Sequence, residues 1–290
     1  MRFRRLLPSA CLLAVWAPVA AQDFDEIKVE RTADKLLFAE GPAWSHEGWL
    51  LFCDVPSNRI LKFVPGEGTQ VFRENSNGAE GNAIDSQGRL YTCESRGRRV
   101  TRTDKKGKID VIAEKFQGKR LNAPNDIVVR HDNQVYFTDP AFGPQLESRE
   151  LDFFGVYHIN PKGELELVAK PKGRPNGIAL APNGKILYVT NSDEKKVYSY
   201  DLDKNGVASN EHVVISGIEG IPDGIRTDEK GNLYIAAKGI LIYTPEAKLI
   251  RQVPLSEKPS NLAFGDADLQ SLYVTARTSV YRFRLPIKGW

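Results

Sequence analysis

Short runs of alternating apolar and polar residues, separated by polar turns, extend along most of the chain. Alternation with a period of two over roughly four to eight residues is typical of half-buried β-strands. No long stretch repeats its apolar residues at the spacing of about 3.6 residues that marks an amphipathic helix. The pattern therefore predicts an all-β protein.

One motif recurs six times along the chain: a polar or acidic residue, a short apolar strand, a polar turn and a second apolar strand. The six copies begin at Glu40, Glu80, Asn125, Asn176, Asp223 and Asn261. Their second strands align at Leu51, Tyr91, Tyr136, Tyr188, Tyr234 and Tyr273. Strand pairs that recur every forty to fifty residues or so are typical of propeller blades, and we therefore predict a six-bladed β-propeller.

The outer strands indicate how the propeller closes. Each repeat continues with a third strand, and five repeats add a fourth, at Thr69–Arg73, Ile109–Ala113, Leu165–Ala169, His212–Ile215 and Leu249–Val253. The sixth repeat has a third strand, Ser279–Leu285, but no fourth. A further strand, Glu26–Glu30, precedes the first repeat. We predict that this N-terminal strand completes blade six, because such closure leaves no open sheet edge.

The first residues have the layout of an export signal. Residues 1–5 carry three arginines, residues 6–20 are apolar, and small residues suitable for cleavage occupy 19–21. The apolar run is too short to span a bilayer and contains two prolines. We therefore predict a signal peptide over 1–21, a single propeller domain over 22–290 and a periplasmic or secreted protein. The consecutive arginines leave the general secretory and twin-arginine routes both open.

Charge limits the classes of partner. The chain carries 40 basic and 37 acidic residues, and residues 1–21 hold three of the basic ones and none of the acidic ones. The remainder is balanced, which argues against nucleic acid or anionic lipid as a partner. No later segment is apolar enough to cross a membrane. Two cysteines remain, Cys53 and Cys93, at equivalent small inner-strand positions, and we expect packed free thiols. We expect a monomer that binds a small molecule.

The first residues of the six repeats predict a metal site. In a propeller these residues ring one mouth of the central channel, and all six side chains carry oxygen. Carboxylates that converge in a hub of low dielectric repel one another unless a cation neutralises them. Oxygen ligands of mixed acid and amide type suit a hard ion, Ca²⁺ best, with Zn²⁺, Mn²⁺ or Mg²⁺ as other candidates. A metal-free polar hub is the alternative.

Other polar residues are expected at the same mouth. The ends of the second strands supply Asp54, Glu94, Asp139 and Asn191, which either contact substrate, brace the ring or begin solvated loops. The long loop from Asp139 to Phe154 has the length of a lid. Lys119, Arg120 and Asn122 are candidate donors to a polyhydroxylated or anionic ligand. The four histidines lie away from the ring, and no Gly-x-Ser-x-Gly elbow occurs, so a serine triad is not expected.

Seven motifs, in order, make the chain similar to a known family. They are Ala-Glu-Gly-Pro-Ala-Trp (39–44), Gly-Arg-Leu-Tyr-Thr-Cys-Glu (88–94), Arg-Arg-Val (98–100), Arg-Leu-Asn-Ala-Pro-Asn-Asp (120–126), Tyr-Phe-Thr-Asp-Pro-Ala-Phe-Gly (136–143), Pro-Asn-Gly-Ile (175–178) and Pro-Asp-Gly-Ile (222–225). Across residues 36–285 the chain resembles the gluconolactonase, regucalcin and luciferin-regenerating-enzyme family. At residues 93–95 this chain has Cys-Glu-Ser, where bacterial relatives commonly have Cys-Glu-His.

The resemblance implies a six-bladed propeller with a divalent metal in its channel. It implies that Glu40, Asn176 and Asp223 are metal ligands and that Asn125 is a ligand or a substrate contact. The leading hypothesis is a Ca²⁺-dependent hydrolase that opens a sugar lactone such as gluconolactone. In it Asp223 accepts the proton of the attacking water, and the candidate substrate contacts are Asn125, Arg120, Asn122, Glu80, Glu94 and Asp139. The alternatives are a non-catalytic binding propeller and a metal-dependent hydrolase of aryl esters or organophosphates.

Overall fold

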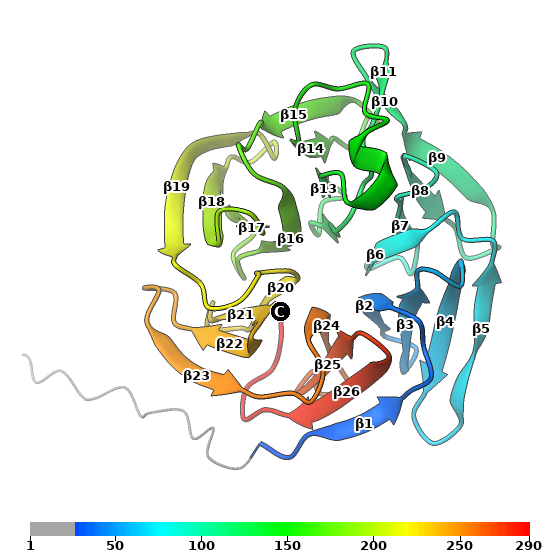
Figure 1. Ribbon diagram of the computed structural model, residues 1–290, viewed down its shortest axis with the longest axis vertical. Helices are drawn as coiled ribbons and strands as arrows, with labels where there is room; N and C mark the ends of the chain where they lie inside the picture. Colours follow the sequence, from blue (N-terminus) through cyan, green and yellow to red (C-terminus); the bar gives the residue numbers. More distant parts are fainter. Residues whose placement is uncertain (1–26) are drawn as a thin grey trace, which may run out of the picture.

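The computed structural model describes residues 27–290, which form six four-stranded antiparallel sheets around a central channel (Figure 1). The predicted six-bladed propeller is confirmed. The predicted signal peptide, residues 1–21, lies outside the described residues. Within the described part of the chain, no helix combines the length and the apolar character needed to cross a membrane.

Blades one to five each contain four strands that are consecutive in the chain. Blade one contains β2 (Ala39–Ser45), β3 (Trp49–Asp54), β4 (Arg59–Val64) and β5 (Gly68–Glu74). Blade two contains β6 (Ala79–Ile84), β7 (Leu90–Glu94), β8 (Arg99–Thr103) and β9 (Ile109–Ala113). Blade three contains β12 (Ile127–Val129), β13 (Val135–Asp139), β14 (Gly155–Ile159) and β15 (Leu165–Ala169). Blade four contains β16 (Pro175–Leu180), β17 (Ile186–Asn191), β18 (Lys196–Leu202) and β19 (Ala208–Ser216). Blade five contains β20 (Ile225–Thr227), β21 (Leu233–Ala237), β22 (Gly239–Tyr243) and β23 (Leu249–Val253).

Blade six is assembled from both ends of the described chain. Its inner strands are β24 (Pro259–Gly265), β25 (Ser271–Ala276) and β26 (Ser279–Arg284), and its outer strand is β1 (Glu30–Ala33), antiparallel to β26 (Figure 1). The predicted closure is confirmed, but the strand begins at Glu30, where the prediction ended. The alternating Ile27 and Val29 that suggested a strand pack against the core of blade six instead of pairing with β26. The hydrogen bonds between β1 and β26 therefore begin further along the chain than the alternating apolar residues do.

The apolar core lies between neighbouring blades. Tyr136 and Val156 of blade three pack in one cluster with Ile178 and Leu187 of blade four. Such side chains alternate with residues on the other face of each strand, as the period of two predicted. Cys53 and Cys93 are buried free thiols, and that prediction is confirmed.

On the first strands, a small residue faces the aligned Leu or Tyr of the second strand in five of the six blades. The pairs are Ala43–Leu51, Ala83–Tyr91, Val128–Tyr136, Ala179–Tyr188, Arg226–Tyr234 and Ala263–Tyr273. Alanine and valine suit this position because six first strands crowd around the channel. Arg226 is the exception, and it extends into the channel to reach Asp126 of blade three.

Two short elements interrupt the blade pattern between β9 and β14. A hairpin, β10 (Lys115–Phe116) and β11 (Lys119–Arg120), follows β9. The long loop between β13 and β14 contains the 3₁₀ helix η1 (Gly143–Leu146). We call residues 140–154 the lid loop.

Candidate functional site

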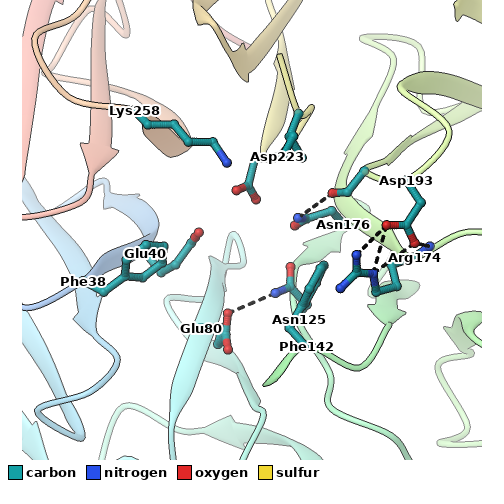
Figure 2. A pocket seen from close by; sticks show the side chains of 12 residues that line it. Phe38, Glu40, Glu80, Asn125, Phe142, Arg174, Asn176, Asp193, Asp223 and Lys258 are labelled. Atoms are coloured by element: carbon teal, nitrogen blue, oxygen red, sulfur yellow. Dashed lines mark hydrogen bonds and ion pairs between the residues drawn. The ribbon is translucent and has the colours of Figure 1, made fainter. Parts of the chain in front are cut away.

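Five of the six predicted ring residues line one cavity of about 430 Å³, in which Figure 2 shows their side chains gathered. They come from blades one to five, and each lies at or just before a first strand: Glu40, Glu80, Asn125, Asn176 and Asp223. The structure therefore brings together the residues to which the sequence assigned metal binding, and it confirms their shared location. We call these five residues the channel ring.

The sixth ring position was predicted wrongly. Ala263 is the blade-six equivalent of Ala43, because each faces the aligned second-strand residue of its blade. Glu40 lies three residues before Ala43, so the equivalent residue of blade six is Ser260, and Asn261 is one position too late. The Ser260 hydroxyl donates to the Ala39 carbonyl at 2.7 Å and does not line the cavity. The ring therefore has five oxygen-bearing members, and a serine occupies the sixth position.

Contacts between neighbouring blades hold the channel ring in place. The carbonyl of Asp223 in blade five accepts bonds from Thr190 Oγ1 at 2.6 Å and from Gly177 N at 3.1 Å, both in blade four. The Asn176 carbonyl in turn accepts a bond from Thr138 Oγ1 of blade three at 2.6 Å. A Cβ atom on Gly177 would lie 2.4 Å from the Asp223 carbonyl oxygen, so this approach requires glycine. The side chains thus project from a backbone that is fixed on both sides.

The carboxylates of the ring are destabilised as anions. Burial raises the pKa of Glu40 well above its ordinary value, and the charges of Asp223 and Glu80 raise it further. Burial also raises the pKa of Asp223 to about 8, against the opposing charge of Lys258, and that of Glu80 to about 7. Three acids that share one enclosed space favour either protonation or a bound cation.

The two carboxamides of the ring are oriented by their neighbours. Asn125 Nδ2 donates to Glu80 Oε2 at 3.0 Å (Figure 2). Asn176 Nδ2 donates to Ser192 Oγ at 3.0 Å. The Ser192 hydroxyl is itself held by the Pro222 carbonyl at 2.8 Å. With its nitrogen occupied, Asn176 presents Oδ1 as the atom that can contact a ligand.

These donors fit a divalent cation. In the described part of the chain, no three acid, imidazole or thiol side chains alone converge as a metal-binding group. A site built from Glu40, Asp223 and the Asn176 carboxamide needs only two such side chains, because its third ligand is an amide oxygen. Hard cations accept mixed carboxylate and amide oxygens and fill remaining positions with water.

The ends of the second strands brace loops and do not line the cavity. Glu94 is fully buried and accepts bonds from Arg73 Nη2 and Arg99 Nε, each at 2.7 Å. Asp139 is also fully buried and accepts the backbone N–H groups of Asn122 and Ala123, each at 2.8 Å. Direct substrate contact by Glu94 and Asp139 is therefore not supported, and neither of the two side chains is exposed to solvent. Neither carboxylate contacts a channel-ring side chain, so these two residues brace neighbouring strands and loops and not the ring itself.

Arg120 and Asn122, also predicted to contact substrate, support the lid loop instead. Asn122 is fully buried and donates through Nδ2 to the Phe153 carbonyl at 2.9 Å. The backbone N–H of Arg120 donates to Glu150 Oε2 at 2.8 Å, while its side chain is exposed and outside the cavity lining. The prediction placed these residues at the right mouth, but the chain turns their side chains away from the cavity.

Sequence reasoning missed several cavity residues because they lie in loops without a repeating pattern. Lys258, between β23 and β24, extends toward Asp223 (Figure 2). Arg174 pairs with Asp193 and lies with Cζ 4.7 Å from the centre of the Phe142 ring. The remaining members of the lining are Phe38, Ser192 and Ile221. Phe142 lies in the motif 136–143 and in the long loop that was expected at this mouth, but no motif marks the other members, which only the loops of the folded chain bring to the mouth.

The histidines lie where the repeat pattern placed them. His46 and His131 line a second cavity of about 330 Å³ together with Trp290, and none of the channel ring lines that cavity. His158 is buried with Nε2 2.5 Å from Gln134 Oε1, and His212 lies on the outer strand β19. Imidazole chemistry at the channel ring is therefore excluded for these four residues.

Comparison with known proteins identifies the family of this chain. The SMP-30/gluconolactonase/LRE-like pattern matches residues 38–278, and the chain belongs to that family. It is 31% identical to a gluconolactonase of Zymomonas mobilis, over 90% of this chain and 82% of that one. A solved gluconolactonase of Xanthomonas campestris superposes with a TM-score of 0.85 at 29% identity over 93% of each chain. Regucalcin from Agrobacterium tumefaciens, a calcium-binding protein, shares the fold with a TM-score of 0.77 at 19% identity, over 88% of this chain and 92% of that one.

Proposed function

We propose that this protein is a metal-dependent lactone hydrolase that opens the ester ring of a sugar lactone such as gluconolactone, with Ca²⁺ as the metal. The observation that carries the proposal is the channel ring, in which carboxylates with raised pKa values share one cavity with carboxamide oxygens. Membership of a family that includes named gluconolactonases supports the same reaction.

Glu40, Asn176 and Asp223 would hold the cation, and Asn125 is either a further ligand or a substrate contact. When bound, a divalent cation supplies a Lewis acid that polarises the lactone carbonyl and stabilises the negative charge that develops on its oxygen. Ca²⁺ suits the site because its coordination geometry is flexible and its ligands are oxygens.

The chain's own residues would move the proton. The free oxygen of the Asp223 carboxylate accepts a proton as a water oxygen bonds to the lactone carbonyl carbon. The bond between that carbon and the ring oxygen then breaks, and the proton passes from Asp223 to the departing ring oxygen. The product is an open-chain hydroxy acid, so the step consumes one water and needs no further reactant. Lys258, which extends toward Asp223, favours the ionised form of that carboxylate and so opposes the effect of burial on its pKa.

Chelation tests the proposal directly. Purified protein should contain about one divalent ion per chain, hydrolyse members of a lactone panel, lose that activity on exhaustive chelation and regain it with added Ca²⁺. Hydrolysis can be followed by proton release, and metal content by elemental analysis. Full activity in protein shown to be free of metal would contradict the metal requirement. Saturable lactone binding without turnover would support a binding propeller instead.

We also propose that the chain is exported through residues 1–21 and acts in the periplasm or outside the cell. The arginines, the apolar run and the small residues at 19–21 support this. N-terminal sequencing of the protein recovered from a periplasmic fraction should begin near Gln22. An intact Met1 on protein confined to the cytosol would contradict it.

A further inference from the structure

Three apolar side chains surround the outer part of the cavity above the channel ring. Phe38 precedes β2, Phe142 belongs to the lid loop, and Ile221 precedes β20, so they come from three separate loops. Phe38 is 36% exposed and Ile221 is 47% exposed, and Phe142 is half-buried. Figure 2 shows Phe38 beside Glu40 and Phe142 beside Asn125. We call these three residues the collar.

The backbone around the collar is held by specific contacts. The N–H groups of Leu37 and Phe38 both donate to Asp54 Oδ1, at 3.0 and 3.1 Å. Phe142 packs against the guanidinium of Arg174, which Asp193 holds. Ile221 precedes Pro222, whose carbonyl accepts a bond from Ser192 at 2.8 Å. The buried Asp54 and Ser192 therefore position exposed apolar groups at the mouth.

The cavity extends beyond the channel ring, and its lining outside the ring consists of the collar together with Arg174, Ser192, Asp193 and Lys258. In the proposed reaction the ester group of the lactone lies at the channel ring, beside Glu40, Asn176 and Asp223. A cavity of about 430 Å³ is in the range that holds drug-sized ligands, which extend well beyond one lactone ring. Exposed apolar side chains at the mouth of a cavity gain free energy when an apolar group covers them. The candidate donors to a polyhydroxylated ligand, Lys119, Arg120 and Asn122, are absent from the lining.

We propose that the collar is a second subsite that binds an alkyl or aryl substituent of the lactone, while the ester group lies on the channel ring. The inference rests on the lactone hydrolysis proposed above and extends its substrate class beyond sugar lactones, to lactones that carry an apolar group away from the carbonyl. Covering Phe38 and Ile221 removes apolar surface from water in proportion to the substituent's size. The collar thus sets selectivity, and the channel ring sets the chemistry.

Matched substrates measure this selectivity in the metal-loaded enzyme. δ-Decalactone is δ-valerolactone with a pentyl substituent, so the pair differs only in the group assigned to the collar. We expect kcat/KM to be at least about 10-fold higher for δ-decalactone. Replacing Phe38 and Ile221 together by alanine should reduce that ratio to within about 3-fold of unity. Glucono-δ-lactone has no apolar group for the collar, so in the double variant its kcat/KM should fall by a smaller factor than that of δ-decalactone.

Matched control variants separate the collar from general effects of removing exposed apolar side chains. Phe72 is 43% exposed on β5 and Ile109 is 41% exposed on β9, and both lie outside the cavity lining. Phe72→Ala and Ile109→Ala should leave the decalactone-to-valerolactone ratio unchanged. A parent enzyme without preference for δ-decalactone, or a loss shared equally by all three lactones, would overturn the proposal while leaving lactone hydrolysis standing.

Binding of a non-hydrolysable analogue tests the collar even if no lactone is turned over. The pentyl-substituted δ-lactam should bind the Ca²⁺-loaded protein at least about 10-fold more tightly than the unsubstituted δ-lactam by calorimetry. The Phe38→Ala, Ile221→Ala protein should lose this difference. Equal affinities in the parent would refute the collar subsite. Tight lactam binding without hydrolysis of any lactone would instead retain the subsite and refute the proposed function.

Discussion

At the scale of single residues, Asp223 and Glu40 differ in what surrounds them, although both are acids of the channel ring. Asp223 has Lys258 and Asn176 beside it, whereas Glu40 Oε2 accepts the N–H of Gly41 at 2.9 Å. Asp223→Asn keeps one oxygen ligand and removes the proton acceptor. We predict that the variant still binds the metal, with lower affinity, and that its kcat is reduced on the order of 100-fold or more. Steady-state kinetics on metal-saturated protein checks this, and near-parental kcat would contradict the role.

Glu40→Gln should behave in the opposite way. It removes a charged ligand but no proton acceptor, so metal affinity falls first and added Ca²⁺ partly restores kcat. Titration of activity against free Ca²⁺ measures the shift. His46→Ala and His131→Ala are controls, because both residues lie at the other cavity. If either control were folded and metal-loaded but inactive, the placement of the reaction at the channel ring would be wrong.

The raised pKa values also predict how the metal-free protein responds to pH. Burial raises the pKa of Glu80 to about 7 and that of Asp223 to about 8, so the folded state holds protons that the unfolded state has already released. Stability therefore falls as pH rises from the ordinary carboxyl range toward about 8. Calorimetric melting of chelated protein should show this decline, and Asp223→Asn or saturating Ca²⁺ should reduce it. Parallel curves in all three samples would contradict the prediction.

At the scale of elements, β1 closes the ring by covering the edge of β26. A chain that begins at Asp34 lacks β1 and leaves the β26 edge unpaired, which favours association between copies. We predict lower thermal stability and aggregation for it, measured by light scattering and calorimetry. A chain that begins at Ile27 keeps β1 and the packing of Ile27 and Val29, and it is the control. A monomeric, equally stable shorter chain would show that β1 is dispensable.

The elements that repeat were predictable, and those that do not repeat were not. All five predicted fourth strands appear, as β5, β9, β15, β19 and β23, because their alternating pattern is local. The sequence placed the sixth ring position one residue too late, at Asn261, because that side chain resembles the other ring residues chemically. Only the pairing of Ala263 with Tyr273 shows that Ser260 occupies the position. A one-residue slip reverses the direction of each side chain in a strand.

At the scale of the whole molecule, Arg226 and Asp126 join three blades across the channel. The fully buried Asp126 accepts Arg226 Nη1 through Oδ2 at 3.1 Å, and Arg226 Nη1 also donates to the Ile178 carbonyl of blade four at 3.2 Å. Arg226→Met leaves the Asp126 carboxylate buried and unpaired. We predict a loss of about 3 kcal/mol in the free energy of unfolding, measured by urea denaturation.

The double variant provides the check on this ion pair. Asp126→Asn in the Arg226→Met background removes the unpaired charge, so part of the lost stability should return. Asp126→Asn alone should lower the free energy of unfolding less than Arg226→Met does, because Arg226 is partly solvated and keeps its hydrogen bonds to backbone carbonyls. Strictly additive losses in the double variant would show that the two side chains do not act as a pair.

The sequence by itself determined the blade number, the closure by an N-terminal strand and the five members of the channel ring, because each depends on a local pattern repeated in register. Only the tertiary structure decided that Ser260 fills the sixth position, that Glu94 and Asp139 are buried braces, and that Lys258 and the collar reach the cavity. These outcomes depend on strand pairing and on the direction of loops between blades. Loops of unequal length carry no shared period, so the neighbours they acquire are set only when six sheets pack around one channel.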